Sequence, residues 1–302
     1  MEKINQIFVI SSSIILLGYI LKRIRLLTKD DGQILVKLVM NVTLPALIIT
    51  VFSSLELSLK LILLPLINII FALLALLLGR YLFKKDLRAN KGSLIISLLG
   101  FNIGLFAYPF VETIWGKLGL KYIAIFDMGN AFIIFGLTYI VSSFYAPNSK
   151  KLLLKEILII LMKFVPLMSY VLAISLNLLH LRLSGIPLQI LQRLAVMNGP
   201  LVLLILGLYL EFSLDKLELK NIIKSISIKY ILGLIVGGSL YFLLPYSKLF
   251  KGVILLGLIM PAGMAIIPYS IENKLNTKIT GSIVNISNII SFILMWLIFK
   301  WI

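Results

Sequence analysis

Residues 93–113 read SLIISLLGFNIGLFAYPFVET, and this stretch decides the fold. It has the length and apolar composition of a membrane-spanning helix, which needs about 20 mostly apolar residues. Four residues interrupt the helical pattern, namely Gly100, Asn102, Gly104 and Pro109. Because Pro109 has no backbone N–H and biases the preceding Tyr108 away from helix, we expect a helix that is broken inside the membrane.

A second stretch of the same kind, FKGVILLGLIMPAGMAIIPYSIE at residues 250–272, is interrupted by Pro261, Gly263 and Pro268. Non-helical backbone is tolerated at membrane depth only where it is buried in protein or lines a cavity. A half-helix that begins at Pro109, Pro261 or Pro268 would direct free N–H groups and the positive end of its dipole into that cavity, which favours an anion. Ordinary kinks are the alternative interpretation. The predicted substrate-binding residues are Asn102, Gly104, Pro109, Pro261, Gly263 and Pro268.

The rest of the chain has the composition of a membrane protein. Of its 302 residues, 60% are hydrophobic and 14% are charged, and the mean hydropathy is +1.08. These are too few polar residues to cover a soluble protein of this length. The apolar runs lack the period-two alternation of barrel strands. We therefore predict an all-α integral membrane protein with ten transmembrane helices near residues 4–21, 34–54, 59–83, 93–115, 122–145, 157–179, 194–212, 228–244, 250–271 and 279–301.

The net charge of +17 comes from basic residues in short loops between the apolar runs. This arrangement indicates membrane topology and contact with anionic lipid headgroups rather than binding to nucleic acid. The loops after the odd-numbered spans, in which we place Lys229, hold about twice as many basic residues as the opposite loops. We expect these loops in the cytoplasm, which leaves both termini outside a multi-pass protein of the plasma membrane.

The two halves of the chain, residues 1–148 and 149–302, resemble each other. Matching positions keep their order at an offset of about 156 to 159 residues: Asn41 and Pro45 with Asn198 and Pro200, Pro109 with Pro268, and Asp127 and Asn130 with Asn285 and Asn288. Because each half holds five spans, the two must insert in opposite orientations. Such inverted repeats are typical of secondary transporters, although apolar helices that align by composition alone would give a similar pattern.

Polar residues inside the spans are candidates for ion coupling. Asp127 lies about two turns into the fifth span, and Asn130 shares its face. A carboxylate in the membrane is costly unless it is paired or hydrated. We interpret Asp127 and Asn130, with Asn285 and Asn288 in the tenth span, as ion-coupling residues, while capping or helix–helix hydrogen bonds explain them equally well. Lys163 could pair with Asp127, but we favour its extension to the headgroups.

Several kinds of chemistry are missing from the sequence. There is no cysteine and only one histidine, which removes disulfides, Cys/His zinc sites and iron–sulfur clusters. No phosphate-binding loop for ATP is present. We therefore expect no enzyme, no catalytic or metal-binding residues and no cofactor, and a coupling ion would be H⁺ or Na⁺.

The sequence resembles the auxin efflux carrier family. The resemblance begins with LGYIL at residues 17–21, followed by a basic turn, and KLVMNVTLPALIITVFSS at residues 37–54. It continues through Asn102, Gly104, Pro109 and the loop at Gly116, and it covers essentially the whole chain. The short connection at residues 147–155 is similar to the compact bacterial branch, which includes malate permeases.

This resemblance implies the fold shared with bile-acid/sodium symporters, in which ten helices form two inverted repeats and the fourth and ninth cross at their broken centres. It also implies a scaffold of spans 1, 2, 6 and 7, often dimeric, and a transport core of spans 3–5 and 8–10. On that pattern the crossover residues are Asn102, Gly104, Pro109, Pro261 and Pro268. The ninth span lacks the carboxylate of the sodium-coupled relatives, which argues against sodium coupling.

We therefore interpret the chain as a secondary transporter of small organic anions such as mono- or dicarboxylates, working by alternating access around a midplane crossover. Its expected partners are the anion, membrane lipids and a second copy bound through the scaffold spans. The main alternative is a cation/proton antiporter that uses Asp127 as the exchanging carboxylate. A membrane scaffold without transport activity is a third interpretation.

Overall fold

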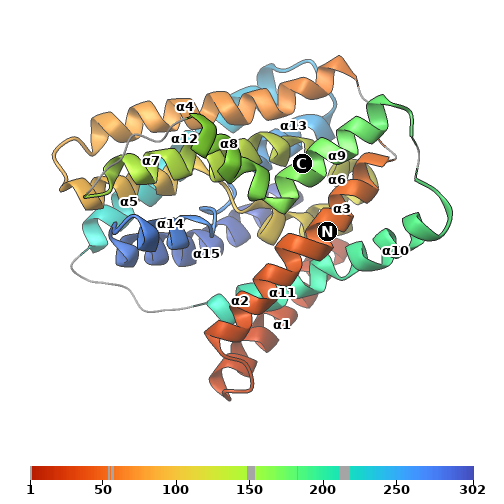
Figure 1. Ribbon diagram of the computed structural model, residues 1–302, viewed down its shortest axis with the longest axis horizontal. Coiled ribbons are helices and arrows are strands. Elements are labelled where there is room, and N and C mark those ends of the chain that lie inside the picture. The colour runs from red at the N-terminus through yellow and green to blue at the C-terminus, as the bar shows by residue number, and fades with distance from the viewer. Residues whose placement is uncertain (1, 54, 56–57, 148–153, 182, 211–217) are drawn as a thin grey trace.

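The computed structural model describes residues 2–53, 55, 58–147, 154–181, 183–210 and 218–302. In this part of the chain the secondary structure is helical, apart from one isolated β-bridge between Phe101 and Ala262. Figure 1 shows the helices packed into one bundle. The predicted all-α class is confirmed. The boundary at residues 148 and 149 lies outside the described residues.

The first half of the chain contains α1 (Glu2–Arg23), α2 (Lys29–Leu38), η1 (Val39–Thr43), α3 (Leu44–Ser53), η2 (Leu59–Ile62), α4 (Leu63–Leu82), α5 (Arg88–Leu99), η3 (Ile103–Ala107), α6 (Tyr108–Phe132), η4 (Ile133–Leu137) and α7 (Thr138–Tyr145). The stretches η1, η3 and η4 are short π-helices inside longer helical runs. Such π-helical turns are frequent at functional sites.

The second half contains α8 (Leu154–Lys163), α9 (Val165–Leu178), α10 (Gly185–Val196), α11 (Asn198–Tyr209), α12 (Leu219–Leu243), α13 (Lys248–Leu258), α14 (Ile266–Glu272) and α15 (Thr277–Trp301). In the first half η3, α6, η4 and α7 follow one another without a gap, whereas α14 and α15 in the second half are separate helices.

Seven helical runs in the described residues are long and apolar enough to cross a membrane, and the bent pair formed by α8 and α9, with an angle of 83°, would make an eighth. The seven are Glu2–Arg23, Asp30–Ser53, Leu59–Leu82, Ile103–Tyr145, Gly185–Tyr209, Leu219–Leu243 and Thr277–Trp301. Many large aliphatic side chains on α1, α4 and α12 face outward, as expected where lipid replaces water. The chain is a multi-pass membrane protein, and the count of ten spans stays a prediction.

The predicted break in the fourth span is present, but it lies before the expected position. Helix α5 ends at Leu99, Gly100 is extended, and helical backbone resumes at Ile103. The half-helix therefore does not begin at Pro109, which is the second residue of α6. Pro109 therefore lies inside the helical run that resumes at Ile103, where it cannot donate a backbone hydrogen bond to the carbonyl one turn earlier. Its effect is the distorted backbone at Leu105 (φ −99°, ψ 16°), four residues earlier.

The break in the ninth span also lies before the last proline of that span. Helix α13 ends at Leu258 and α14 begins at Ile266. Pro261 lies in the break itself, whereas Pro268 is the third residue of α14 and sits inside its first turn. The expectation that a half-helix starts at Pro261 or Pro268 is therefore wrong. Both prolines are compatible with the break, but neither is the first residue of the helix that follows.

The two breaks meet, and we call residues 100–102 and 261–263 the crossing. The isolated antiparallel bridge between Phe101 and Ala262 lies at its centre. Extended backbone from one broken segment thus pairs with extended backbone from the other. This pairing supplies hydrogen bonds to groups that a continuous helix would have satisfied internally.

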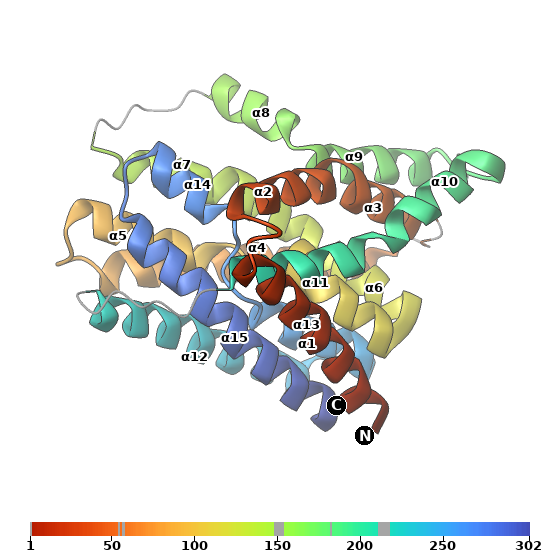
Figure 2. The same cartoon turned by 90° about the horizontal axis from the view of Figure 1, so that it is seen from below.

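Close helix packing surrounds the crossing. Helix α1 runs along α11 at Gly18 and Gly207, where a Cβ on either glycine would collide with the backbone of the other helix. Small residues at such contacts let membrane helices approach closely. Helix α3 packs on both α9 and α10. Figure 2 shows α1 beside α15 with the two termini close together, and the Trp296 indole N–H donates to Asn5 Oδ1 at 3.1 Å.

Candidate functional site

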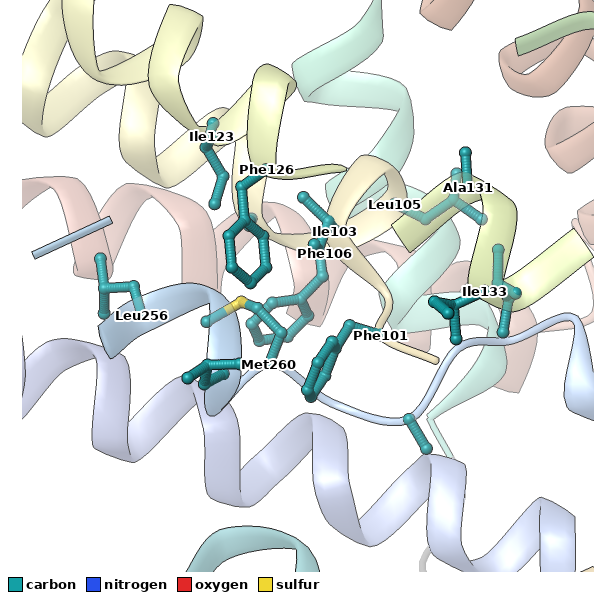
Figure 3. Packing of buried hydrophobic residues seen from close by; sticks show 14 of the residues in the cluster. Phe101, Ile103, Leu105, Phe106, Ile123, Phe126, Ala131, Ile133, Leu256 and Met260 are labelled. Atoms are coloured by element: carbon teal, nitrogen blue, oxygen red, sulfur yellow. The ribbon is translucent and has the colours of Figure 1, made fainter. Parts of the chain in front are cut away.

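Backbone hydrogen bonds join the two broken segments at the crossing. The N–H of Asn102 donates to the Pro261 carbonyl at 2.9 Å, and the N–H of Gly263 donates to the Gly100 carbonyl at 3.2 Å. Gly100 has no space for a side chain, because a Cβ there would collide with the side chain of Ile134. Figure 3 shows apolar side chains from both segments, including Phe101 and Met260, packed around this point.

Asn130 on α6 holds residues 100–102, the first segment of the crossing, in place. Its Oδ1 accepts from the N–H of Phe101 at 2.8 Å, and its Nδ2 donates to the Phe101 carbonyl at 2.9 Å. Nδ2 also donates to Asp127 Oδ1 at 2.9 Å. One buried amide therefore satisfies both backbone groups of Phe101 that point away from the bridge and orients the carboxyl of Asp127 as well.

Serines on α15 perform the equivalent task in the second half. Ser287 Oγ accepts from the N–H of Ala262 at 3.0 Å, and the Ser291 hydroxyl donates to the Ile259 carbonyl at 2.7 Å. The sequence comparison of the two halves pairs Asn130 with Asn288, but the contact to the crossing is made by the neighbouring Ser287. Short hydroxyl side chains suffice because α15 lies against the break.

Asp127 on α6 is buried among neutral hydrogen-bond donors. Its Oδ2 lies 2.8 Å from the Tyr108 hydroxyl and 3.1 Å from the Tyr170 hydroxyl, and these two hydroxyls are 2.7 Å apart. Tyr108 belongs to α6 and Tyr170 to α9. No described Lys, Arg or His forms an ion pair with Asp127, and Lys163 is exposed at the end of α8. The favoured position of Lys163 at the headgroups fits this exposure.

A cavity of about 70 Å³ opens beside the crossing. Five of the predicted site residues line it, together with Tyr170 and apolar side chains: Asn102, Gly104, Asp127, Asn130 and Gly263. Since liquid water occupies about 30 Å³ per molecule, this space suits water or a small ion. A dicarboxylate would require the cavity to widen.

Asn102 supplies a free donor at this cavity. The residue is 4% exposed, and its Nδ2 has no hydrogen-bond partner among the described residues. Gly104 allows close approach, because a Cβ there would lie 3.0 Å from Leu44 and 3.8 Å from Asp127 Oδ2. A buried amide donor without a partner is costly, which makes this group a candidate for contact with a ligand.

The structure does not bring the other predicted residues to the cavity. Pro109 lies against α11, where a Cβ on Gly199 would be 3.7 Å from its Cβ. Pro268 lies within α14, and Pro261 contributes only its carbonyl to the crossing. Asn288 lines a separate cavity of about 300 Å³ between α1, α11 and α15, and its Oδ1 has no partner among the described residues.

Asn285 also lies away from the cavity beside the crossing. Its Nδ2 donates to the Gly281 carbonyl at 3.1 Å, one turn earlier in α15. The tenth-span pair formed by Asn285 and Asn288 therefore does not join the site of Asp127 and Asn130.

The prediction that Lys229 belongs to a basic loop is wrong. It lies within α12, is 2% exposed, and its Nζ is 4.1 Å from the centroid of the Phe101 ring. The helix starts at Leu219, so Lys229 is about three turns inside it. The spacing of Ile222, Ser225, Ile226 and Lys229 at i, i+3, i+4 and i+7 places all four on one buried face.

Crossed broken helices around a buried polar cavity, in an all-helical membrane protein, are the architecture of a membrane transporter. The chain belongs to the membrane transport protein family, whose profile matches residues 1–299. This confirms the resemblance to the auxin efflux carrier family and places the chain among transporters rather than enzymes.

Two similar proteins come from methanogenic archaea. An uncharacterized transporter of Methanothermobacter thermautotrophicus is 26% identical over 285 residues, which cover 93% of this chain and 92% of the relative. An uncharacterized transporter of Methanocaldococcus jannaschii is 28% identical over 293 residues, which cover 93% of each chain.

Proposed function

We propose that this protein is a secondary transporter of small organic anions, such as mono- or dicarboxylates, that works by alternating access around the crossing. The observation that supports this most is the unpaired Asn102 Nδ2, which lies beside a cavity at the start of the η3 half-helix. The positive dipole end of a helix and a neutral amide donor both favour a carboxylate. The driving force is a proton gradient, an exchanged anion or the gradient of the solute.

The same proposal includes ten spans in two inverted repeats, with spans 1, 2, 6 and 7 as a scaffold and spans 3–5 and 8–10 as the moving core. The contacts of α1 with α11, and of α3 with α9 and α10, support one scaffold group. A second copy would bind through this group. The distribution of basic loops supports a plasma-membrane location with both termini outside.

Tyr170 connects the two proposed groups of helices. It comes from α9 in the scaffold, while its hydroxyl contacts Asp127 and Tyr108 in the core. Movement of the core past α9 would break these hydrogen bonds and open the cavity on one side. The cavity volume of about 70 Å³ in this conformation fits a state that must open before a carboxylate enters.

The test is substrate binding and counterflow in liposomes with Asn102→Ala. Loss of a hydrogen bond to a charged group costs about 1.5–3 kcal/mol, so carboxylate binding should weaken by about 10- to 150-fold. The matched control is Asn41→Ala, because Asn41 is exposed and bonds only within its own helical turn. Wild-type binding in Asn102→Ala, with carboxylate flux intact, would place the solute elsewhere. Absence of carboxylate flux in the wild type would refute the proposed substrate class.

The second candidate function is cation/proton antiport with Asp127 as the exchanging carboxylate. It is favoured by one observation, namely that Asp127 is buried without a cationic partner among the described residues. Addition of Na⁺ or K⁺ to acid-loaded liposomes would then release protons through the wild type. Carboxylate counterflow without such proton release would reject this candidate.

A further inference from the structure

Lys229 is a buried amine beside the crossing. Its residue is 2% exposed, and its Nζ has no hydrogen-bond partner among the described residues. The face of the Phe101 ring lies against the amine, 4.1 Å from Nζ to the ring centroid. Phe101 is the residue whose backbone forms the bridge to Ala262 and is held by Asn130.

No carboxylate faces this amine from the helices that pack against α12. These are α5, α13 and α15, and like α12 they contain no Asp or Glu. Lys224, one turn and a half away on α12, reaches the end of α4 instead. The ionisable side chains of α12 other than Lys229, and of α4, α5, α13 and α15, are basic residues and tyrosines: Arg80, Tyr81, Arg88, Lys91, Lys220, Lys224, Tyr230, Tyr241, Lys248, Lys251, Lys278 and Lys300.

Glu218 and Asp127 are both hydrogen-bonded to other side chains. Glu218, just before α12, accepts hydrogen bonds from three amides: Asn90, Asn221 and Asn276. Asp127 lies on the Asn130 side of Phe101 and is bound by Tyr108, Tyr170 and Asn130. Neither carboxylate is hydrogen-bonded to Lys229.

An ammonium group at this position would leave most of its hydrogen-bonding capacity unused. It carries three N–H donors, and the ring face of Phe101 offers one weak electrostatic partner. A charge that is buried without a counter-ion or acceptors is strongly disfavoured. A neutral amine needs far less solvation, and one N–H can still point at the ring.

We propose that Lys229 is a proton-exchanging site, uncharged in this conformation and protonated when the core moves past the scaffold and water reaches the amine. The proposal rests on the proposed alternating access. In the exchange step the Nζ lone pair accepts a proton from water on one side of the membrane, and the same N–H bond breaks to release it on the other side. The coupling ion of the transporter is then H⁺.

The position of Phe101 links this site to the solute. Phe101 lines the cavity beside the crossing, and its ring lies against the amine. When the core moves past α9 and the cavity widens, water that enters it reaches this ring and the Lys229 amine. A protonated Lys229 then attracts a carboxylate to the neighbouring Asn102 donor. One proton and one monocarboxylate cross the membrane together without net charge.

The first test measures the protonation of Lys229 without using transport. Lys229→Met keeps an apolar side chain of similar length, and Lys229→Gln is a second neutral variant should the first fail to fold. Reversible unfolding in mixed detergent micelles is followed by tryptophan fluorescence as a function of pH. An unfolded lysine is protonated below about pH 10, so unfolding of the wild type takes up one proton.

The stability of the wild type relative to Lys229→Met should therefore increase with pH, because the unfolded state binds more protons. The ratio of folded to unfolded protein should rise about tenfold per pH unit more steeply in the wild type, between about pH 7 and pH 9. The matched control is Lys224→Met, an exposed lysine on the same helix, which should titrate like the wild type. Equal pH dependence in wild type and Lys229→Met would overturn the proposal.

The second test separates this proposal from the proposed function. In liposomes, an inward proton gradient should accelerate carboxylate uptake by the wild type and by the control Lys224→Met, and not by Lys229→Met. A gradient response that persists in Lys229→Met overturns the proton site and leaves anion transport standing. If the wild type moves no carboxylate at all, the proposed substrate fails, and the pH-dependent unfolding still decides the charge of Lys229.

Discussion

Asn130→Ala tests whether one amide holds the crossing together. The substitution removes the acceptor for the Phe101 N–H and the donor to the Phe101 carbonyl, and it also removes the donor to Asp127. Asn130 is 3% exposed. The N–H and carbonyl of Phe101 would then be buried without these partners. The hydrogen bonds of the bridge do not replace them, because those bonds use the N–H of Asn102 and the carbonyl of Gly100.

The size of the effect follows from these lost partners. A buried polar group that loses its hydrogen bond costs about 1–3 kcal/mol, so two unpaired groups predict a decrease of about 2–6 kcal/mol in the free energy of unfolding. Water that enters the vacated space brings the loss toward the lower end of this range. The bond to Asp127 adds a further contribution because it orients a buried carboxyl.

The assay is reversible unfolding in mixed detergent micelles, compared with carboxylate counterflow in liposomes. Asn41→Ala is the matched control, since it removes one exposed hydrogen bond within a helical turn and should change stability by about 0.5 kcal/mol or less. Counterflow should fall in Asn130→Ala even at a temperature where the protein is folded. Equal stability of the two alanine variants would refute the role of Asn130 as the support of the crossing.

Two further predictions concern topology and Asp127. Because the chain has no native cysteine, Lys85→Cys and Lys248→Cys, both at exposed positions, can be labelled singly with an impermeant reagent. In intact cells Lys248→Cys should react and Lys85→Cys should not. The reverse pattern would invert the proposed orientation. Asp127→Asn keeps a polar side chain among Tyr108, Tyr170 and Asn130, so this variant should fold. If Asp127 carries a coupling proton, carboxylate accumulation driven by a pH gradient should disappear while carboxylate exchange continues. An unchanged response to the pH gradient would assign the coupling role elsewhere.

The sequence predicted the breaks but not their first helical residues. Gly100 and Pro261 mark the interruptions correctly, because a missing Cβ and a missing N–H both act locally. The start of each following half-helix could not be predicted in the same way. A proline is accepted in the first turn of a helix, so Pro268 fits a start two residues earlier as well as a start at the proline itself. Pro109 lies after a π-helical turn, and the sequence does not show that this turn precedes it.

The candidate site was predicted in part for a related reason. Asn102 and Gly104 lie near one break, and Asp127 and Asn130 share a helix face, so local spacing was enough to nominate them. Tyr170 and Ser287 reach the site from other helices, and only the packing of α9 and α15 shows this.

Lys229 shows a different limit of sequence analysis. Lysines in a stretch between apolar runs usually indicate a loop, and the first three turns of α12 carry several of them. The buried face becomes visible only when the helix is extended back to Leu219. Hydropathy alone starts this span near residue 228, which leaves Lys229 at its edge.

Hydrogen-bond requirements separate the supporting residues from those that remain for a solute. Backbone exposed by a break in the membrane must find partners inside the protein. At the crossing the Pro261 carbonyl accepts from Asn102, and the Gly100 carbonyl accepts from Gly263. The side chain of Asn130 bonds the backbone of Phe101, and that of Ser287 bonds the N–H of Ala262. Each of these groups is therefore already hydrogen-bonded within the protein.

What remains is small and chemically specific. After the backbone is satisfied, the cavity retains two side chains: the Asn102 amide, whose Nδ2 has no partner in the described part of the chain, and the Asp127 carboxyl, whose partners are neutral. Against the Phe101 ring, the Lys229 amine likewise has no hydrogen-bond partner among the residues that the structure describes. Since structural hydrogen bonds do not account for Asn102 or Lys229, and since Asp127 is the one carboxyl at the cavity, these three side chains are where substitutions should change transport without dismantling the crossing.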